Sequence, residues 1–111
     1  MPFRTRQTIG QREHTVLLAI GRLEGDAYGI RIQREIEIRT RQLISVGAVY
    51  ATLERLHAKG LVSSYEGDPT PIRGGRAKRF YKIEGPGRRA LDDARQALEE
   101  LWSPSQPRLV L

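Results

Sequence analysis

With 111 residues, 39% of them hydrophobic and 29% charged, the chain has the composition of a single soluble domain with a modest core. It has no cysteine, no apolar run of the roughly 18 residues that a membrane span requires, and no apolar stretch at its N-terminus. These absences exclude disulfides, thiolate metal sites and cysteine nucleophiles and lead us to expect a cytoplasmic protein. The net charge of +6 favours an anionic partner, such as nucleic acid or a membrane surface.

The N-terminal part has the apolar periodicity of two short helices. Residues 1 to 12 are polar and basic and are expected to form a basic arm. From about Glu13 to Leu23 apolar residues recur at helical spacing, and Gly25 suits the left-handed position after that helix. Asp26 is expected to cap a second helix that runs to about Arg39. The isoleucines of this second segment also alternate as in a strand, but the strong helix formers between them favour a helix.

The third helix, over residues 45 to 58, has the clearest pattern. Ser45 can cap its first turn, and Gly60 can end it. Four apolar residues form one stripe that is expected to face the core: Val46, Val49, Leu53 and Leu56. Because only residues 40 to 44 connect it to the preceding helix, the two segments predict a helix-turn-helix unit.

The apolar period changes after Gly60. Leu61–Glu66 and Arg79–Ile83 have the composition of two strands, and the segment between them is rich in glycine and proline. A hairpin directly after a helix-turn-helix is the arrangement of a winged helix, which we expect to span residues 13 to 84. The predicted fold class is therefore mainly α with a small β-hairpin.

A final helix is expected over residues 85 to 102, followed by a flexible tail over residues 103 to 111. The helix carries an apolar seam at helical spacing, made of Leu91, Ala94, Leu98, Leu101 and Trp102. The seam has little of its own domain to cover, so we expect it to be a homodimer interface and the helix to be a dimerisation helix. The alternative is that the seam folds back onto the first helix.

The exposed face of the third helix is a candidate DNA-binding surface, because the early residues of such a helix reach base edges in the major groove. The candidate contacts are Ser45, Gly47, Ala48, Tyr50, Ala51, Thr52 and Arg55. Ser45 can bond a phosphate or only cap the helix, and Tyr50 can donate to a phosphate or fill the edge of the core. Ala51 and the Thr52 methyl can contact a thymine methyl group. Arg55 has an exposed position, which many arginines occupy without a function.

The basic residues of the hairpin form a second candidate surface. Arg73, Arg76, Lys78 and Arg79 fall within seven residues that include no acidic residue and follow or flank two glycines. Such a cationic segment can follow the phosphates or insert an arginine into the minor groove. The alternative is a solvated loop in which Arg76 or Arg79 pairs with Glu66 across the hairpin. The position beside the third helix favours DNA.

The sequence has no catalytic or metal-binding pattern. His14 and His57 stand apart from each other and from acidic clusters, and no nucleophile–base pair or glycine-rich phosphate loop occurs. We therefore expect neither an enzyme nor a bound cofactor or metal. A winged helix that binds protein is an alternative, which an acidic third-helix face would favour. That face instead carries one Glu54 and one Arg55 next to a basic hairpin.

Three motifs resemble those of the PadR family of transcription regulators. They are His14–Ile20 with Ala27–Ile30, then Val46–Leu56 with Lys59–Val62, and finally Gly74–Ile83 ending at Gly87. Their order and the single terminal helix resemble the short PadR subfamily. Glu84 departs from the pattern, because the family usually has a threonine there that caps the last helix.

The resemblance implies a dimeric repressor that binds a near-palindromic operator in double-stranded DNA and is released by a small-molecule effector or a stress signal. Some family members stack flat ligands on an aromatic residue of the last helix, so a small aromatic effector is a candidate partner. Here Trp102 lies near the chain end, where a structural anchor is an equal alternative.

Overall fold

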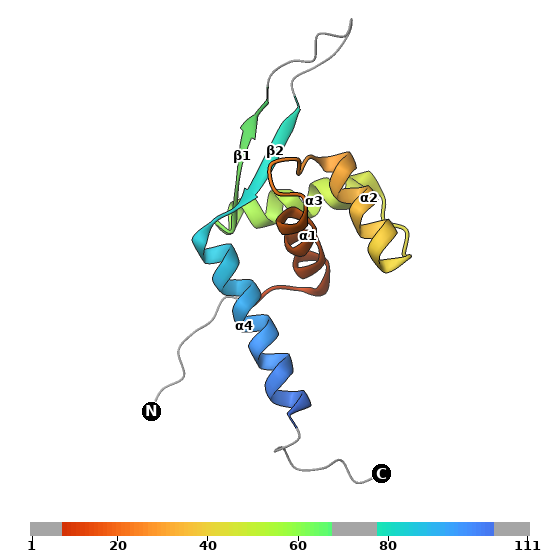
Figure 1. The fold of residues 1–111 in the computed structure, drawn as a ribbon. Coiled ribbons are helices and arrows are strands. Elements are labelled where there is room, and N and C mark those ends of the chain that lie inside the picture. The colour runs from red at the N-terminus through yellow and green to blue at the C-terminus, as the bar shows by residue number, and fades with distance from the viewer. Residues whose placement is uncertain (1–7, 68–77, 104–111) are drawn as a thin grey trace, which may run out of the picture.

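The computed structural model describes residues 8–67 and 78–103, which form four helices and one two-stranded antiparallel sheet (Figure 1). In chain order the elements are α1 (Gln11–Arg22), α2 (Gly29–Thr40), α3 (Val46–Ala58), β1 (Val62–Glu66), β2 (Arg79–Ile83) and α4 (Gly85–Trp102). The hairpin projects from one end of the molecule, and α4 extends toward the other. The predicted fold class, a helix-turn-helix followed by a hairpin and a C-terminal helix, is confirmed.

The core lies where α1, α2 and α3 meet. Val16 and Leu17 of α1, Ile32 of α2, and Leu53 and Leu56 of α3 are fully buried. The α3–β1 connection, β1 and α4 each add one buried residue to the same core, which are Leu61, Val62 and Ala90. Burial of these apolar side chains is the main stabilising contribution, at about 1.5–3 kcal/mol for each large one.

The first two helices begin at residues other than those the sequence predicts. α1 begins at Gln11, two residues early, because the carboxylate of Glu13 accepts a hydrogen bond from the Gly10 N–H at 2.8 Å and caps the first turn. α2 begins only at Gly29, so the prediction that Asp26 caps it is wrong. The intervening backbone is extended: the Tyr81 N–H donates to the Ala27 carbonyl at 2.8 Å, and Tyr28 bridges to β2. These hydrogen bonds to the hairpin prevent an earlier helical turn.

Gly60 is the residue directly after the C-cap of α3, as predicted, whereas Gly25 lies one residue farther from α1 than predicted, because that helix ends at Arg22 with Leu23 as its cap. Gly25 and Gly60 have φ angles of +82° and +74°, in the left-handed region that favours glycine after a helix. Ser45 caps α3, since its Oγ accepts from the Ala48 N–H at 3.0 Å. The buried stripe of α3 differs from the prediction, because Val46 is 38% exposed whereas Val49 is buried. Val46 is the first residue of the helix and lies beyond the reach of the core.

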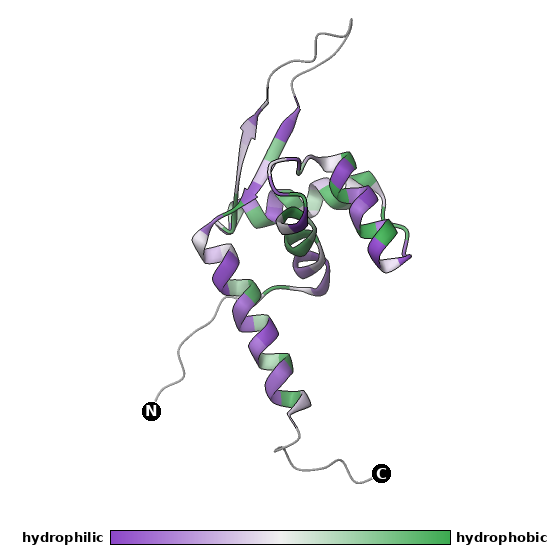
Figure 2. Ribbon diagram, viewed as in Figure 1, coloured by the Kyte–Doolittle hydropathy of each residue, from purple (hydrophilic) through white to green (hydrophobic). Residues whose placement is uncertain are grey.

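The hairpin pairs in one continuous register from Val62 opposite Ile83 to Glu66 opposite Arg79. Residues 68–77, which include most of the predicted turn, lie outside the described residues. After β2, α4 begins with Gly85 and has Pro86 in its first turn, where the missing N–H of proline costs nothing. Hydrophilic and hydrophobic residues alternate along the helix (Figure 2).

Candidate nucleic-acid interface

Tyr50 connects the exposed face of α3 to the start of α2. Its ring and hydroxyl lie so close to Gly29 that a side chain at this position would overlap them. The residue is nevertheless 45% exposed. Both interpretations of Tyr50 are therefore compatible with its position, because the ring packs at the edge of the domain while part of it stays open to a ligand.

Thr52 does not lie on the exposed face. Its side chain is fully buried, and its hydroxyl donates to the Ala48 carbonyl at 2.8 Å and accepts from the Arg55 Nη2 at 3.2 Å. The prediction that its methyl group contacts a thymine is wrong, since no part of the side chain reaches the surface. Ser45, Gly47 and Ala51 are exposed, and Ala48 is half-buried.

Arg55 is engaged by a buried carboxylate that the sequence analysis did not single out. Its Nε lies 3.9 Å from the Oε2 of Glu13, and the Nζ of Lys59 lies 2.8 Å from the same oxygen and donates to Oε1 at 2.9 Å. Burial raises the pKa of Glu13, but the hydrogen bonds from Lys59 and Gly10 and the nearby positive charges outweigh it and lower the pKa below its ordinary value. An acidic residue at the third position of a helix is a sequence signal for a helix cap, so the capping role of Glu13 could have been predicted. Its basic partners could not, because only the fold brings Arg55 and Lys59 next to it.

Lys78 and Arg79, the two candidate DNA-contacting cations of the hairpin that the structure describes, have intramolecular contacts. Arg79 donates to Glu66 at 3.2 Å and to Ser64 at 3.1 Å, which is the cross-strand pairing considered as an alternative. Lys78 places its Nζ 4.3 Å from the centre of the Tyr28 ring, in a cation–π contact. Both pairs are at least partly exposed, so a phosphate can compete for either cation. Arg73 and Arg76 lie outside the described residues.

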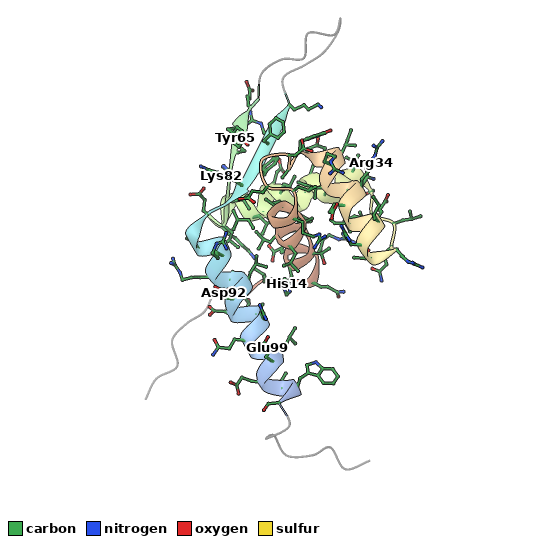
Figure 3. All side chains as sticks on the ribbon, viewed as in Figure 1. His14, Arg34, Tyr65, Lys82, Asp92 and Glu99 are labelled. Atoms are coloured by element: carbon green, nitrogen blue, oxygen red, sulfur yellow. The ribbon has the colours of Figure 1, made fainter. Side chains whose placement is uncertain are left out.

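An aromatic cluster stiffens the hairpin one residue pair nearer its base. Phe80 packs edge-to-face against Tyr28 and stacks on Tyr65, with ring centroids 5.6 Å apart in each pair. Tyr65 lies on the outer part of the hairpin, whereas Lys82 lies nearer its base (Figure 3). Because Tyr28 immediately precedes α2, the cluster fixes the direction of the hairpin relative to the helix-turn-helix.

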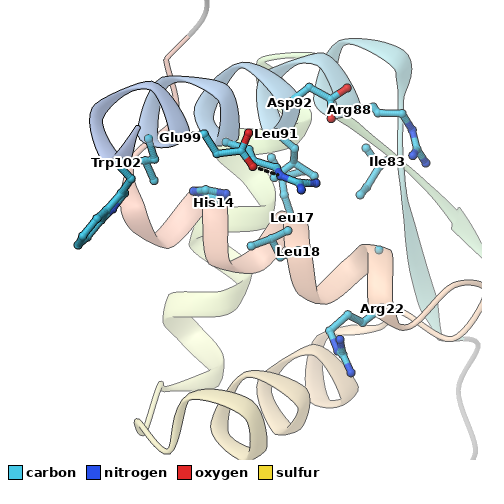
Figure 4. A pocket seen from close by; sticks show the side chains of 13 residues that line it. His14, Leu17, Leu18, Arg22, Ile83, Arg88, Leu91, Asp92, Glu99 and Trp102 are labelled. Carbon is cyan, nitrogen blue, oxygen red and sulfur yellow. Dashed lines mark hydrogen bonds and ion pairs between the residues drawn. The ribbon is translucent and has the colours of Figure 1, made fainter. Parts of the chain in front are cut away.

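An open groove of about 780 Å³ lies between α1 and α4, and three residues of the predicted seam line it, namely Leu91, Leu98 and Trp102. His14 and Leu18 of α1 face Leu91 and Glu99 of α4 across this groove (Figure 4). Leu91 packs on the core and Ala94 is half-buried. Farther along the helix, Leu98, Leu101 and Trp102 are 53%, 77% and 85% exposed. Within the described residues, the seam thus folds back onto its own domain only in its first half.

In residues 8–67 and 78–103, no group of three or more histidine or acidic residues is placed to hold a metal ion. No helix in that part of the chain is long and apolar enough to cross a membrane. The arrangement therefore offers a helix with an exposed N-terminal half, a cationic hairpin beside it, and an apolar seam on a separate helix.

Comparison with known proteins identifies the family. Residues 16–93 match the model of the transcriptional regulator PadR-like family. The chain belongs to the PadR-like family of transcriptional regulators. This membership confirms the resemblance of the three motifs and makes the protein a regulator rather than an enzyme. The match includes α2, α3 and the hairpin and ends within α4.

Individual relatives agree with the PadR assignment. The chain is 37% identical over 78 residues to the "Transcriptional regulator Rv3488" of Mycobacterium tuberculosis, an alignment that covers 70% of this chain and 68% of the relative. A PadR-family regulator from Clostridium difficile R20291 is 25% identical and superposes with a TM-score of 0.63 over 84% of this chain and 92% of the other. The RosR protein of H. salinarum, at 23% identity, shares the fold with a TM-score of 0.69 over 88% of this chain and 81% of its own.

Proposed function

We propose that this PadR-like regulator binds double-stranded DNA sequence-specifically and represses transcription as a homodimer. One observation carries the proposal: Lys78, at the outer end of the described hairpin, and the exposed N-terminal half of α3 are linked by consecutive contacts. Lys78 lies over Tyr28, and the next residue, Gly29, lies against the ring of Tyr50. A major-groove helix and a phosphate-binding wing require this adjacency.

The proposed DNA contacts follow from exposure and charge. α3 would enter the major groove with Ser45, Gly47, Ala48, Tyr50 and Ala51 toward the DNA and with Arg55 near a phosphate. The wing residues Arg73, Arg76, Lys78 and Arg79 would follow the adjacent backbone. Small residues in the first turn of α3 support a close approach, since a Cβ added at Gly47 would meet no atom within 4 Å. The net charge of +6 supports a polyanionic partner.

The exposed half of the α4 seam supports dimerisation. Leu98, Leu101 and Trp102 are large apolar side chains on a helix that extends away from the domain. A second copy would cover them, and two-fold symmetry would place two copies of α3 about one turn of DNA apart on a near-palindromic operator. The groove between α1 and α4 continues from this seam, so a small aromatic effector bound there would act on both protomers.

The proposal is tested by the binding of the full-length protein to its own upstream DNA in a gel-shift titration over a range of salt concentrations. Tyr50→Ala and Arg76→Ala are expected to weaken binding, and Arg76→Ala to reduce the log–log salt slope by about one unit. Arg89→Ala is the matched control, because it removes an equal charge from an exposed position on α4. Undiminished binding by both Tyr50→Ala and Arg76→Ala would contradict the assigned DNA-binding surface.

Repression is tested separately with a reporter gene placed behind the bound sequence. Expression of the protein is expected to lower reporter output, because a dimer on the operator occludes the promoter. Increased output would identify an activator. Output that is restored by a flat aromatic compound, and not by an aliphatic one of similar size, would support the effector.

A further inference from the structure

The first two turns of α3 present almost no side chain that can read a base by hydrogen bonding. Val46 is 38% exposed, and Gly47 and Ala51 are exposed without any polar side-chain atom. The Oγ of Ser45 already accepts the Ala48 N–H. The hydroxyl of Tyr50 lies beside Gly29, at the rim of this face.

The polar residues of α3 lie farther along the helix and have other contacts. Thr52 is buried against the Ala48 carbonyl. Glu54 lies toward the hairpin, where it lines a hollow together with Tyr81. Arg55 bonds Thr52 and lies near the Glu13 carboxylate. Specific recognition by paired hydrogen bonds, as from an arginine to guanine or from an asparagine to adenine, therefore has no donor set in this part of the helix.

The geometry points to recognition of thymine methyl groups. Resting on the proposed DNA binding, we infer that the methyl groups of Val46 and Ala51 contact the C5-methyl groups of thymines in the major groove and supply the main base discrimination of α3. The thymine methyl is the one apolar group that the unmodified bases present in that groove. Because Gly47 and Ala48 add little bulk between these residues, the helix can come close enough for van der Waals contact.

The surroundings of this surface favour DNA over an apolar peptide as its occupant. Apart from Val46 and Tyr50, the exposed residues of this surface are Ser45, Gly47 and Ala51, which offer little apolar area to a partner helix. The surface is bordered by Lys78 and Arg79, which lie at the outer end of the described hairpin and complement phosphates. Both features fit a DNA duplex, in which the thymine methyl group lies in the major groove between two negatively charged phosphate backbones.

The experiment measures the dissociation constant of the full-length protein on an operator selected from random-sequence DNA. Each thymine of a half-site is replaced in turn by uracil, which keeps every hydrogen-bonding group and removes only the methyl. Replacement of a contacted thymine is expected to weaken binding roughly three- to five-fold, the effect of one buried methyl group. Replacement of thymines that flank the operator is expected to change nothing.

A matched pair of variants assigns the effect to the helix face. Ala51→Ser and Ala58→Ser make the same change at two exposed positions of α3, and only Ala51 lies in its N-terminal half. At one position of each half-site, Ala51→Ser is expected to reduce the factor by which uracil in place of thymine weakens binding. Ala58→Ser is expected to leave that factor unchanged. Val46→Thr, which exchanges a methyl for a hydroxyl, is expected to act at a second position. Thermal unfolding confirms that all three variants fold.

The outcomes separate this inference from the function on which it rests. Tight selective binding that is unchanged by uracil at every half-site position would overturn methyl recognition and leave DNA binding intact. A uracil effect that is identical in wild type, Ala51→Ser and Val46→Thr would also overturn it, since the contact would then come from elsewhere. Failure to select any sequence would overturn both, and would favour a protein partner.

Discussion

At the scale of single residues, Glu13 links the start of α1 to the end of α3. It is 6% exposed, caps the first turn of α1 and binds Lys59 just after the end of α3. α1 also lines the groove toward α4 with His14 and Leu18. One helix thus contacts the C-terminal part of α3 on one side and the apolar seam on the other. Its position is therefore tied to both surfaces that the proposed function uses.

Glu13→Gln is expected to lower the free energy of unfolding by about 1–3 kcal/mol at pH 7, because it leaves a partly buried lysine without its charge partner. The folded-state pKa of Glu13 lies below its ordinary value, so the unfolded state binds more protons in acid. The ionised Glu13 therefore contributes its full share to the free energy of unfolding above about pH 4.3, the ordinary pKa of a glutamate. This contribution is lost as the pH falls through the lowered pKa of the folded state. Urea unfolding at pH 7 and pH 3 is expected to show that the gap between wild type and variant narrows in acid.

The lowered pKa of Glu35, which comes from hydrogen bonds donated by Arg22 and Arg39, gives an acid response that wild type and the Glu13 variant share. Only the difference between the two proteins therefore reports on Glu13. Glu24→Gln, at an exposed position, is the control and is expected to change little. A gap that stays constant from pH 7 to pH 3 would contradict the assignment of the effect to the charge.

Gly29→Ala tests the contact with Tyr50. The new methyl group would overlap the end of the Tyr50 ring, which can swing outward because it is half-exposed. Stability is therefore expected to change by less than about 1 kcal/mol, whereas operator affinity falls to the level of Tyr50→Ala. Gly47→Ala, where the added methyl meets no atom, is expected to raise stability by up to about 1 kcal/mol. A large loss of stability in Gly29→Ala would show that the ring cannot move.

At the scale of elements, the attachment of α4 depends on Gly87. A Cβ at this position would overlap the backbone carbonyl of Leu61 and the side chain of Ile83, which belong to the α3–β1 connection and to β2. The glycine allows the first turn of α4 to lie directly on the base of the hairpin. The direction in which α4 leaves the domain is set there.

Gly87→Ala is expected to cost about 1–3 kcal/mol of unfolding free energy, because backbone atoms rather than a flexible side chain must move. Gly85→Ala is the matched control, two residues earlier in the same turn, where an added methyl group meets nothing within 4 Å. Chemical unfolding of the two variants measures the difference. Equal free energies of unfolding for the two variants would show that the first turn of α4 can move away from Leu61 without loss of stability.

At the scale of the whole molecule, the exposed half of the α4 seam is the proposed interface of the homodimer. Leu98→Glu is expected to convert a dimer into a monomer and to weaken operator binding, because each half-site would then be bound independently. Gln96→Glu places the same charge on α4 two residues earlier, away from the seam, and is expected to remain dimeric. Sedimentation velocity measures both. A wild-type monomer, or a dimeric Leu98→Glu, would contradict the seam as the interface.

Much of this protein follows from local patterns in the sequence. The order of the elements, the two strands and the ends of α1 and α3 were predictable because apolar periodicity and turn residues such as Gly25 and Gly60 act over a few neighbouring residues. The same is true of the cap at Ser45, whose partner is three residues away. The family resemblance also rests on such contiguous motifs, and the family match confirms it.

Only the tertiary structure decided which residues of these elements are exposed and which are buried. Val46 was expected to be buried and is exposed, whereas Thr52 was expected to be exposed and is buried, because the core reaches the middle of α3 and not its first residue. α2 starts late because Ala27 and Tyr28 bond to a hairpin more than fifty residues away. The sequence by itself thus determined the elements and the family, whose signals are local. Packing between distant segments determined the faces of α3, the partners of Glu13 and the uncovered part of α4.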